Sequence, residues 1–184
     1  AGLLGLRHGN VMAVVAMDGT YAFKGNESAL TGADGFDAKA SRFALLDLRR
    51  RQGMQSADLN FAPIDGMRHA DCTYVQLNAM HHSDFTSFSM TADAMHLPIK
   101  AEYNGSGWNR ATARQGYELS ARIVLAFFDE HVKADHAAAA QLASLLTSST
   151  VASSRHENPL PVPPGASDVV AMAQQGKATT IKSM

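Results

Sequence analysis

An unbroken apolar run near the start of the chain limits its fold more than any other feature. Residues 11–17, with the sequence VMAVVAM, contain no polar side chain and lead into Asp18-Gly19. A half-buried strand alternates apolar and polar residues, whereas a strand covered on both faces of a parallel sheet reads as a continuous apolar run. The run therefore predicts a parallel strand buried on both faces, and with it a domain of the α/β class.

Two further apolar segments predict more strands of this sheet. Residues 43–48 (FALLDL) precede three arginines, and residues 72–77 (CTYVQL) lead into His81 and His82 without an intervening helix. Open α/β sheets bind ligands and place catalytic groups beyond the carboxyl ends of their strands. Asp18 after the first strand and the histidines after the third are therefore the candidate functional residues.

The second half of the chain is predicted to be mainly helical. A long helix is expected from about residue 111 to 134, and an alanine- and leucine-rich helix over 136–146. The apolar residues that recur at helical spacing in the long helix, and that would form its buried face, are Tyr117, Ala121, Val124, Leu125, Phe128 and Val132.

The remaining segments are expected to connect these elements. Loops are predicted over 20–41 and 89–109, and short helices at about 1–8, 57–69 and 167–184. Residues 147–154 are rich in serine and threonine, and residues 159–164 (PLPVPP) should form extended, polyproline-like chain.

Composition excludes several classes of protein. A chain of 184 residues with 46% hydrophobic and 18% charged residues is long enough for one globular domain with a sizeable core. The 16 basic and 17 acidic residues nearly cancel, and no basic run extends beyond 49–51, so a role in binding nucleic acid is not expected. No apolar run approaches the roughly 18 residues of a membrane span. The one cysteine, Cys72, is expected to be buried and inert, and no feature indicates the compartment or the oligomeric state.

The order of these segments resembles the C-terminal half of an α/β-hydrolase. The resemblance is carried by VMAVVAMDGTY, FALLDL, YVQLNAMHHSDFTSF and ELSARIVLAFFDEHVKAD. These stretches resemble the platelet-activating-factor acetylhydrolase-like branch of the serine α/β-hydrolases and its dienelactone-hydrolase-like relatives. The resemblance implies the C-terminal half of a hydrolase domain over residues 1–135, followed by a helical and proline-rich extension over residues 136–184.

The resemblance also implies a nucleophile, an aspartate and a histidine in that chain order. Carried onto this sequence, Asp18 is the acid and His82, within His82-Ser83-Asp84-Phe85, is the general base. The implied activity is hydrolysis of a small-molecule carboxylic ester through an acyl-serine intermediate, without a cofactor. The alternative base is His81, and the alternative acids are Asp47, Asp58 and Asp65.

The chain departs from this family at the nucleophile. The G-x-S-x-G motif that carries the catalytic serine does not occur in the 184 residues. The nearest sequence is Gly165-Ala166-Ser167-Asp168-Val169, which lacks the closing glycine and follows a proline-rich segment instead of a strand. We therefore expect the chain to be the C-terminal part of a longer hydrolase, inactive unless another segment supplies the serine.

Two other classes of function compete with the hydrolase. One is a metal enzyme, because six residues of the types that ligate metals lie within a short span: His69, Asp71, His81, His82, Asp84 and His96. None of the compact ligand spacings such as H-E-x-x-H is present, however. The other class is a non-catalytic binding protein of α/β-hydrolase type, in which the histidines only line a pocket. Tyr103 and Trp108 are aromatic residues of a glycine-rich loop and are left out of the predicted site.

Overall fold

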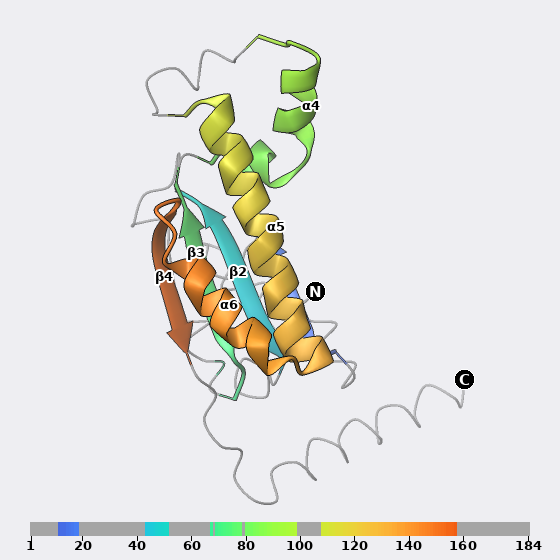
Figure 1. The fold of residues 1–184 in the computed structure, drawn as a ribbon, viewed down its shortest axis with the longest axis vertical. Helices are drawn as coiled ribbons and strands as arrows, with labels where there is room; N and C mark the ends of the chain where they lie inside the picture. Colours follow the sequence, from blue (N-terminus) through green and yellow to red (C-terminus); the bar gives the residue numbers. More distant parts are fainter. Residues whose placement is uncertain are drawn as a thin grey trace, which may run out of the picture.

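The sheet predicted from the apolar runs is present in the computed structural model, which describes residues 11–18, 43–51, 67, 69–78, 80–98 and 108–157. Three strands run parallel in the order β1-β2-β3. A fourth strand, β4, lies antiparallel beside β3 (Figure 1). The three parallel strands and the helices against them give the α/β arrangement that the sequence predicts. The strand bounds are Ala13–Met17 for β1, Ala44–Arg50 for β2, Cys72–Leu77 for β3 and Val151–Glu157 for β4.

The register of the parallel strands brings their carboxyl ends to one edge of the sheet. Met17 of β1 lies beside Leu48 of β2, and Arg50 at the end of β2 lies beside Leu77 at the end of β3. The residues that follow the strands, which include Asp18 after β1, therefore gather at this edge.

Burial on both faces was predicted for residues 11–17, but the structure shows it in β2 and not in β1. Residues 44–49 of β2 are all buried, because this strand lies between two others. In β1 only Val14 and Ala16 are buried, whereas Met12 just before the strand and Met17 at its end are 56% and 43% exposed. The difference follows from position, since β1 is an outer strand of the described sheet.

Helix α5, Arg110–Lys133, lies across one face of the sheet (Figure 1). It begins at Asn109, whose side chain accepts a hydrogen bond from the backbone N–H of Thr112 at 2.9 Å. It ends at Ala134, which has a positive φ of 56°. The helix confirms the predicted one to within a residue at each end.

The face that α5 buries differs from the predicted face. Leu125 and Val132, which were expected to be buried, are 58% and 49% exposed. The buried positions instead follow the spacing 113, 116, 120, 123, 127, and three of these residues are small. Small side chains allow the helix to approach the sheet closely. The sequence prediction considered only the large apolar residues of the helix and therefore missed these small buried positions. The buried residues are Ala113, Gly116, Leu119, Ser120, Ile123, Ala126 and Phe127.

Helix α6, His136–Leu146, has the bounds that the sequence predicts and packs beside α5. Its Leu142 and Leu145 join the hydrophobic cluster that β2, β3 and α5 form. The chain then turns into β4, a strand that the serine- and threonine-rich composition of residues 147–154 did not predict. Residues 136–157 therefore complete the same core and the same sheet.

Two short helices occupy segments that were expected to lack helix. A 3-10 turn, η3, covers His82–Phe85, and α4 covers Phe88–Ala94. Local polar side chains hold both: the hydroxyl of Thr86 donates to the carbonyl of Ser83 at 2.6 Å, and that of Thr91 donates to the carbonyl of Ser87 at 3.0 Å. Because these short helices are held by local polar side chains, their sequences show little apolar periodicity, and they were not predicted.

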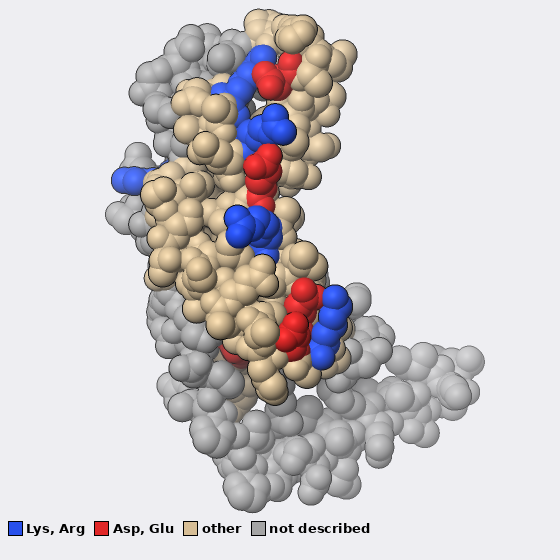
Figure 2. Space-filling model, in the orientation of Figure 1, with Lys and Arg blue, Asp and Glu red and all other residues tan. Residues whose placement is uncertain are grey.

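Charges of both signs alternate along α5 on the face shown in Figure 2. Within the described ranges, no helix is both long and apolar enough to cross a bilayer. Several predicted segments lie outside the described residues: the loop over 20–41, the polyproline-like stretch and the short helices at 1–8, 57–69 and 167–184.

Candidate active site

Asp18 directly follows β1, and its carboxylate is buried in the protein. Its backbone N–H donates to the carbonyl of Leu48 on β2 at 2.6 Å, and its φ is +46°. Aspartate is one of the few residues other than glycine that tolerate this left-handed region. The side chain is only 2% exposed, so the strand end presents a buried acceptor at the edge where the parallel strands finish.

His82 meets that carboxylate from the other side of β2. It follows β3 and opens the η3 turn, and its Nδ1 lies 2.6 Å from Oδ2 of Asp18. The histidine side chain is 73% exposed. In the part of the chain that the structure describes, no serine, threonine or cysteine side chain hydrogen-bonds to it. The structure thus brings together the predicted acid and base, 64 residues apart in sequence.

Arg50 is a third member of this group that sequence reasoning missed. Its Nη1 donates to the same Oδ2 of Asp18 that His82 contacts, and its backbone N–H lies 3.4 Å from Oδ1. Because Arg50 is the last residue of β2, it lies between the ends of the strands that carry the other two residues. The sequence indicated only that one of the three arginines after the predicted strand, residues 49–51, could lie at this edge of the sheet.

Asp84 holds the histidine loop in place. This buried carboxylate accepts hydrogen bonds from the backbone N–H of His81 at 2.8 Å, from Nε1 of Trp108 at 2.8 Å and from the hydroxyl of Ser89. Trp108, which was left out of the predicted site, therefore joins the segment before α5 to the loop that carries His82. Its contribution is to position that loop.

The residues considered as alternatives to His82 and Asp18 do not take part in the contact between those two residues. The ring of His81 packs edge to face with Trp108, with ring centroids 6.3 Å apart, whereas His82 is the histidine whose ring nitrogen contacts Asp18. Asp47 lies in the interior of β2, where its Oδ2 accepts from Nε of Arg49 at 3.1 Å and both side chains are fully buried. Burial raises the pKa of Asp47 to about 6, and the neighbouring Arg49 opposes that rise. Asp58 and Asp65 lie outside the described residues.

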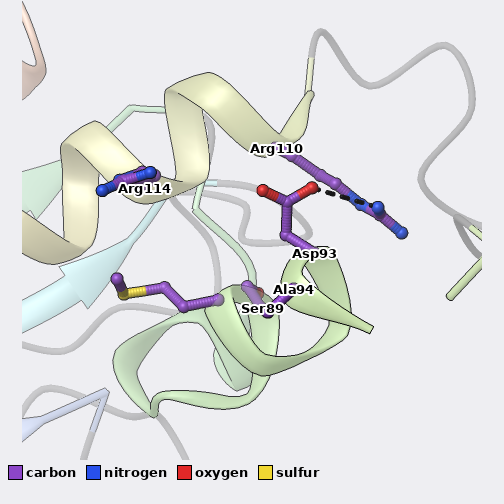
Figure 3. A pocket seen from close by; sticks show the side chains of 6 residues that line it. Ser89, Asp93, Ala94, Arg110 and Arg114 are labelled. Atoms are coloured by element: carbon purple, nitrogen blue, oxygen red, sulfur yellow. Dashed lines mark hydrogen bonds and ion pairs between the residues drawn. The ribbon is translucent and has the colours of Figure 1, made fainter. Parts of the chain in front are cut away.

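A pocket of about 340 Å³ lies between α4 and the first turns of α5 (Figure 3). Across it, Nη1 of Arg110 lies 3.1 Å from Oδ1 of Asp93. Neither Asp18 nor His82 lines it. The lining residues are Ser89, Met90, Asp93, Ala94, Arg110 and Arg114.

The metal-ligating residues that cluster in sequence do not cluster in space. Among the described residues, the one group with ligand atoms close enough to share an ion is Asp71 with Glu130 and His131. Of the six residues considered from sequence, only Asp71 belongs to it. Those six residues therefore do not form a common metal site.

Comparison of the chain with models of known protein families found no match, and neither did comparisons with curated proteins or with solved structures.

Proposed function

We propose that Asp18 and His82 are the acid and the general base of a serine-type α/β-hydrolase that acts on carboxylic esters. The observation that carries the proposal is the 2.6 Å contact between Oδ2 of Asp18 and Nδ1 of His82. Both residues follow parallel strands at the edge where α/β proteins bind ligands, and their chain order is that of the resembled family.

The chemistry follows from the hydrogen bond at Nδ1. A carboxylate that accepts from Nδ1–H fixes the imidazole in the tautomer whose Nε2 is an acceptor. That nitrogen can take the proton of a serine hydroxyl as the oxygen attacks an ester carbonyl. The carboxylate stabilises the imidazolium that forms, and Nε2 then returns the proton to the leaving alcohol.

The serine of this proposal is not among the 184 residues, because no G-x-S-x-G motif occurs in them. The segment that supplies it would approach His82, whose side chain is 73% exposed. We therefore expect the 184-residue chain by itself to have no esterase activity, since loss of one triad member costs several orders of magnitude in kcat.

A fluorophosphonate probe tests the proposal on the protein expressed from its complete reading frame. The comparison covers wild type, His82→Ala, Asp18→Asn and a matched control, His136→Ala, which changes an exposed histidine of α6. We expect one serine of the wild type and the control to be labelled, and the labelling rate to fall at least about a hundredfold in the other two variants. Equal labelling of all four proteins, or no labelled serine in any, would refute the proposal.

One observation favours a non-catalytic binding protein as the second candidate. In the described part of the chain, no nucleophilic side chain hydrogen-bonds to the exposed ring of His82. If the protein is a non-catalytic binding protein, the contact between Asp18 and His82 is only a polar contact at the edge of the sheet, without a catalytic role. The absence of any labelled serine in the folded full-length protein would favour this candidate over the hydrolase.

A further inference from the structure

A second group of polar side chains lies at the opposite end of β3 from His82. Asp71 immediately precedes β3, and Glu130 and His131 lie in the last turn of α5. Nε2 of His131 is 3.8 Å from Oδ2 of Asp71 and 3.9 Å from Oε2 of Glu130. A strand of six residues extends roughly 20 Å, so this group is separate from the proposed active site.

The imidazole of His131 is held with Nε2 toward the two carboxylates. Its ring packs against Phe127, one turn earlier on α5, with ring centroids 4.6 Å apart. The His131 side chain is only 15% exposed, and Nε2 is buried without a hydrogen-bond partner among the described residues. Such a nitrogen normally has a partner, because burying an unsatisfied polar atom costs free energy.

The ion pairs do not satisfy this nitrogen. Hydrogen bonds between a protonated imidazole and a carboxylate are about 2.7–2.9 Å long, whereas the two distances here are 3.8 and 3.9 Å. A zinc ion binds nitrogen and oxygen ligands at about 2.0–2.2 Å, which places tetrahedral ligands roughly 3.4 Å apart. The ligand atoms of the three residues all lie within 4.8 Å of one another, so small side-chain movements would close them around an ion.

The charges of the group also favour a cation. Two carboxylates and a neutral imidazole carry two negative charges, and the carboxyl end of α5 adds the negative end of the helix dipole. The side chains of Asp71 and Glu130 are 20% and 25% exposed. The group is thus partly sheltered from water while an ion can still reach it.

We propose that Asp71, Glu130 and His131 bind a divalent transition-metal ion of the zinc type, with water completing its coordination. Carboxylate and imidazole ligands suit zinc, and three protein ligands plus water is a common zinc coordination. The ion would join the end of α5 to the start of β3. The proposal does not depend on the esterase proposal, because none of its ligands belongs to the Asp18 and His82 pair.

Calorimetric titration of the 184-residue chain with Zn²⁺ tests this site. We expect one ion bound per chain, and affinity reduced at least about tenfold by His131→Ala, Asp71→Asn and Glu130→Gln. The control variants His96→Ala and His136→Ala change exposed histidines elsewhere and should bind Zn²⁺ as the wild type does. Co²⁺ in place of Zn²⁺ should give the visible absorption of a four-coordinate ion.

Thermal unfolding gives a readout that separates metal binding from loss of fold. At a Zn²⁺ concentration about a hundredfold above Kd, the unfolding temperature of the wild type should rise roughly 5–10 °C. The conservative variants Asp71→Asn and Glu130→Gln should unfold cooperatively with at most about half of that rise, because a tenfold weaker site is stabilised by only about half as much at the same Zn²⁺ concentration. No binding by the wild type, or equal binding and equal stabilisation in all variants, would overturn the proposal and leave the three residues as an ion-pair cluster.

Discussion

At the scale of single residues, one oxygen atom organises the candidate site. Oδ2 of Asp18 is shared by Nδ1 of His82 and Nη1 of Arg50. A carboxylate whose side chain is 2% exposed needs such partners, because an ionised group without them is costly to bury. Arg50 therefore gives a cationic hydrogen-bond donor to the carboxylate on which the proposed role of His82 depends.

A double-mutant cycle measures this support. Arg50→Gln should lower the free energy of unfolding by about 2 kcal/mol, since it removes a charge-assisted hydrogen bond from a buried acceptor. In an Asp18→Asn background the same change should cost less than about 1 kcal/mol. Urea unfolding of the four proteins gives the coupling. An equal cost of Arg50→Gln in both backgrounds would show that the two side chains do not stabilise each other.

Asp47 makes a separate prediction about pH. Burial raises its pKa from 3.8 to about 6, so the folded chain holds this proton more tightly than the unfolded chain does. Its contribution to stability is therefore greatest below about pH 4 and is lost as the pH rises through 6. The free energy of unfolding of the wild type, relative to Asp47→Asn, should fall by about 2 kcal/mol between pH 4 and pH 7. A difference between the two proteins that is constant across this range would contradict the assignment.

At the scale of elements, α5 reaches the histidine loop through a glycine. A Cβ at Gly116 would lie 2.6 Å from Sδ and 2.7 Å from Cγ of Met80, which is buried one residue before His81. The close approach of the helix thus fixes the start of the loop that carries His82. Asp84 fixes the same loop from its other end through Trp108.

Gly116→Ala should therefore have opposite effects in two backgrounds. In the wild type, overpacking against Met80 costs about 1–3 kcal/mol and outweighs the gain of about 1 kcal/mol in helix propensity. We expect a net loss of about 1 kcal/mol. In a Met80→Ala background the space is free, and Gly116→Ala should stabilise the chain by about 1 kcal/mol. Chemical unfolding provides the measurement, and the same sign in both backgrounds would argue against this contact.

At the scale of the whole molecule, residues on both sides of position 135 share one hydrophobic cluster. Leu142 of α6 is 4% exposed and packs with residues of β2, β3 and α5. Leu142→Ala should cost about 2–5 kcal/mol and lower the stability of the whole cooperative unit. The control Leu125→Ala changes a leucine that is 58% exposed and should cost within about 0.5 kcal/mol. A small effect of Leu142→Ala would mean that α6 unfolds independently.

Sequence patterns predicted where the helices and strands lie better than they predicted which residues these elements bury or pair with. Long apolar runs and helical periodicity gave β1, β2, β3, α5 and α6, because burial of whole segments leaves a strong signal. The buried face of α5 was predicted only in part: Val124 and Phe128 pack against the core. Gly116 and Ser120, which are buried, were missed because they carry little apolar weight. The strand β4 was missed because pairing through backbone hydrogen bonds requires no particular side chains.

The site was predictable only where position along a strand decided it. The contact between Asp18 and His82 could be predicted because both residues follow strands of one parallel sheet, whose carboxyl ends meet. Arg50 was missed because nothing in the sequence distinguishes the arginine that contacts Asp18 from Arg49, which turns into the interior to Asp47. Likewise, Asp71 and His131 are brought together only by the packing of α5 on the sheet.

The tautomer of His82 tests most directly whether Asp18 and His82 act as an acid and a base. Nitrogen NMR of the chain labelled with ¹⁵N-histidine, at a pH where the imidazole is neutral, distinguishes a proton on Nδ1 from one on Nε2. We predict that the proton of His82 is on Nδ1 in the wild type and moves largely to Nε2 in Asp18→Asn. A neutral His82 protonated on Nε2 in the wild type, or the same tautomer in both proteins, would contradict the account.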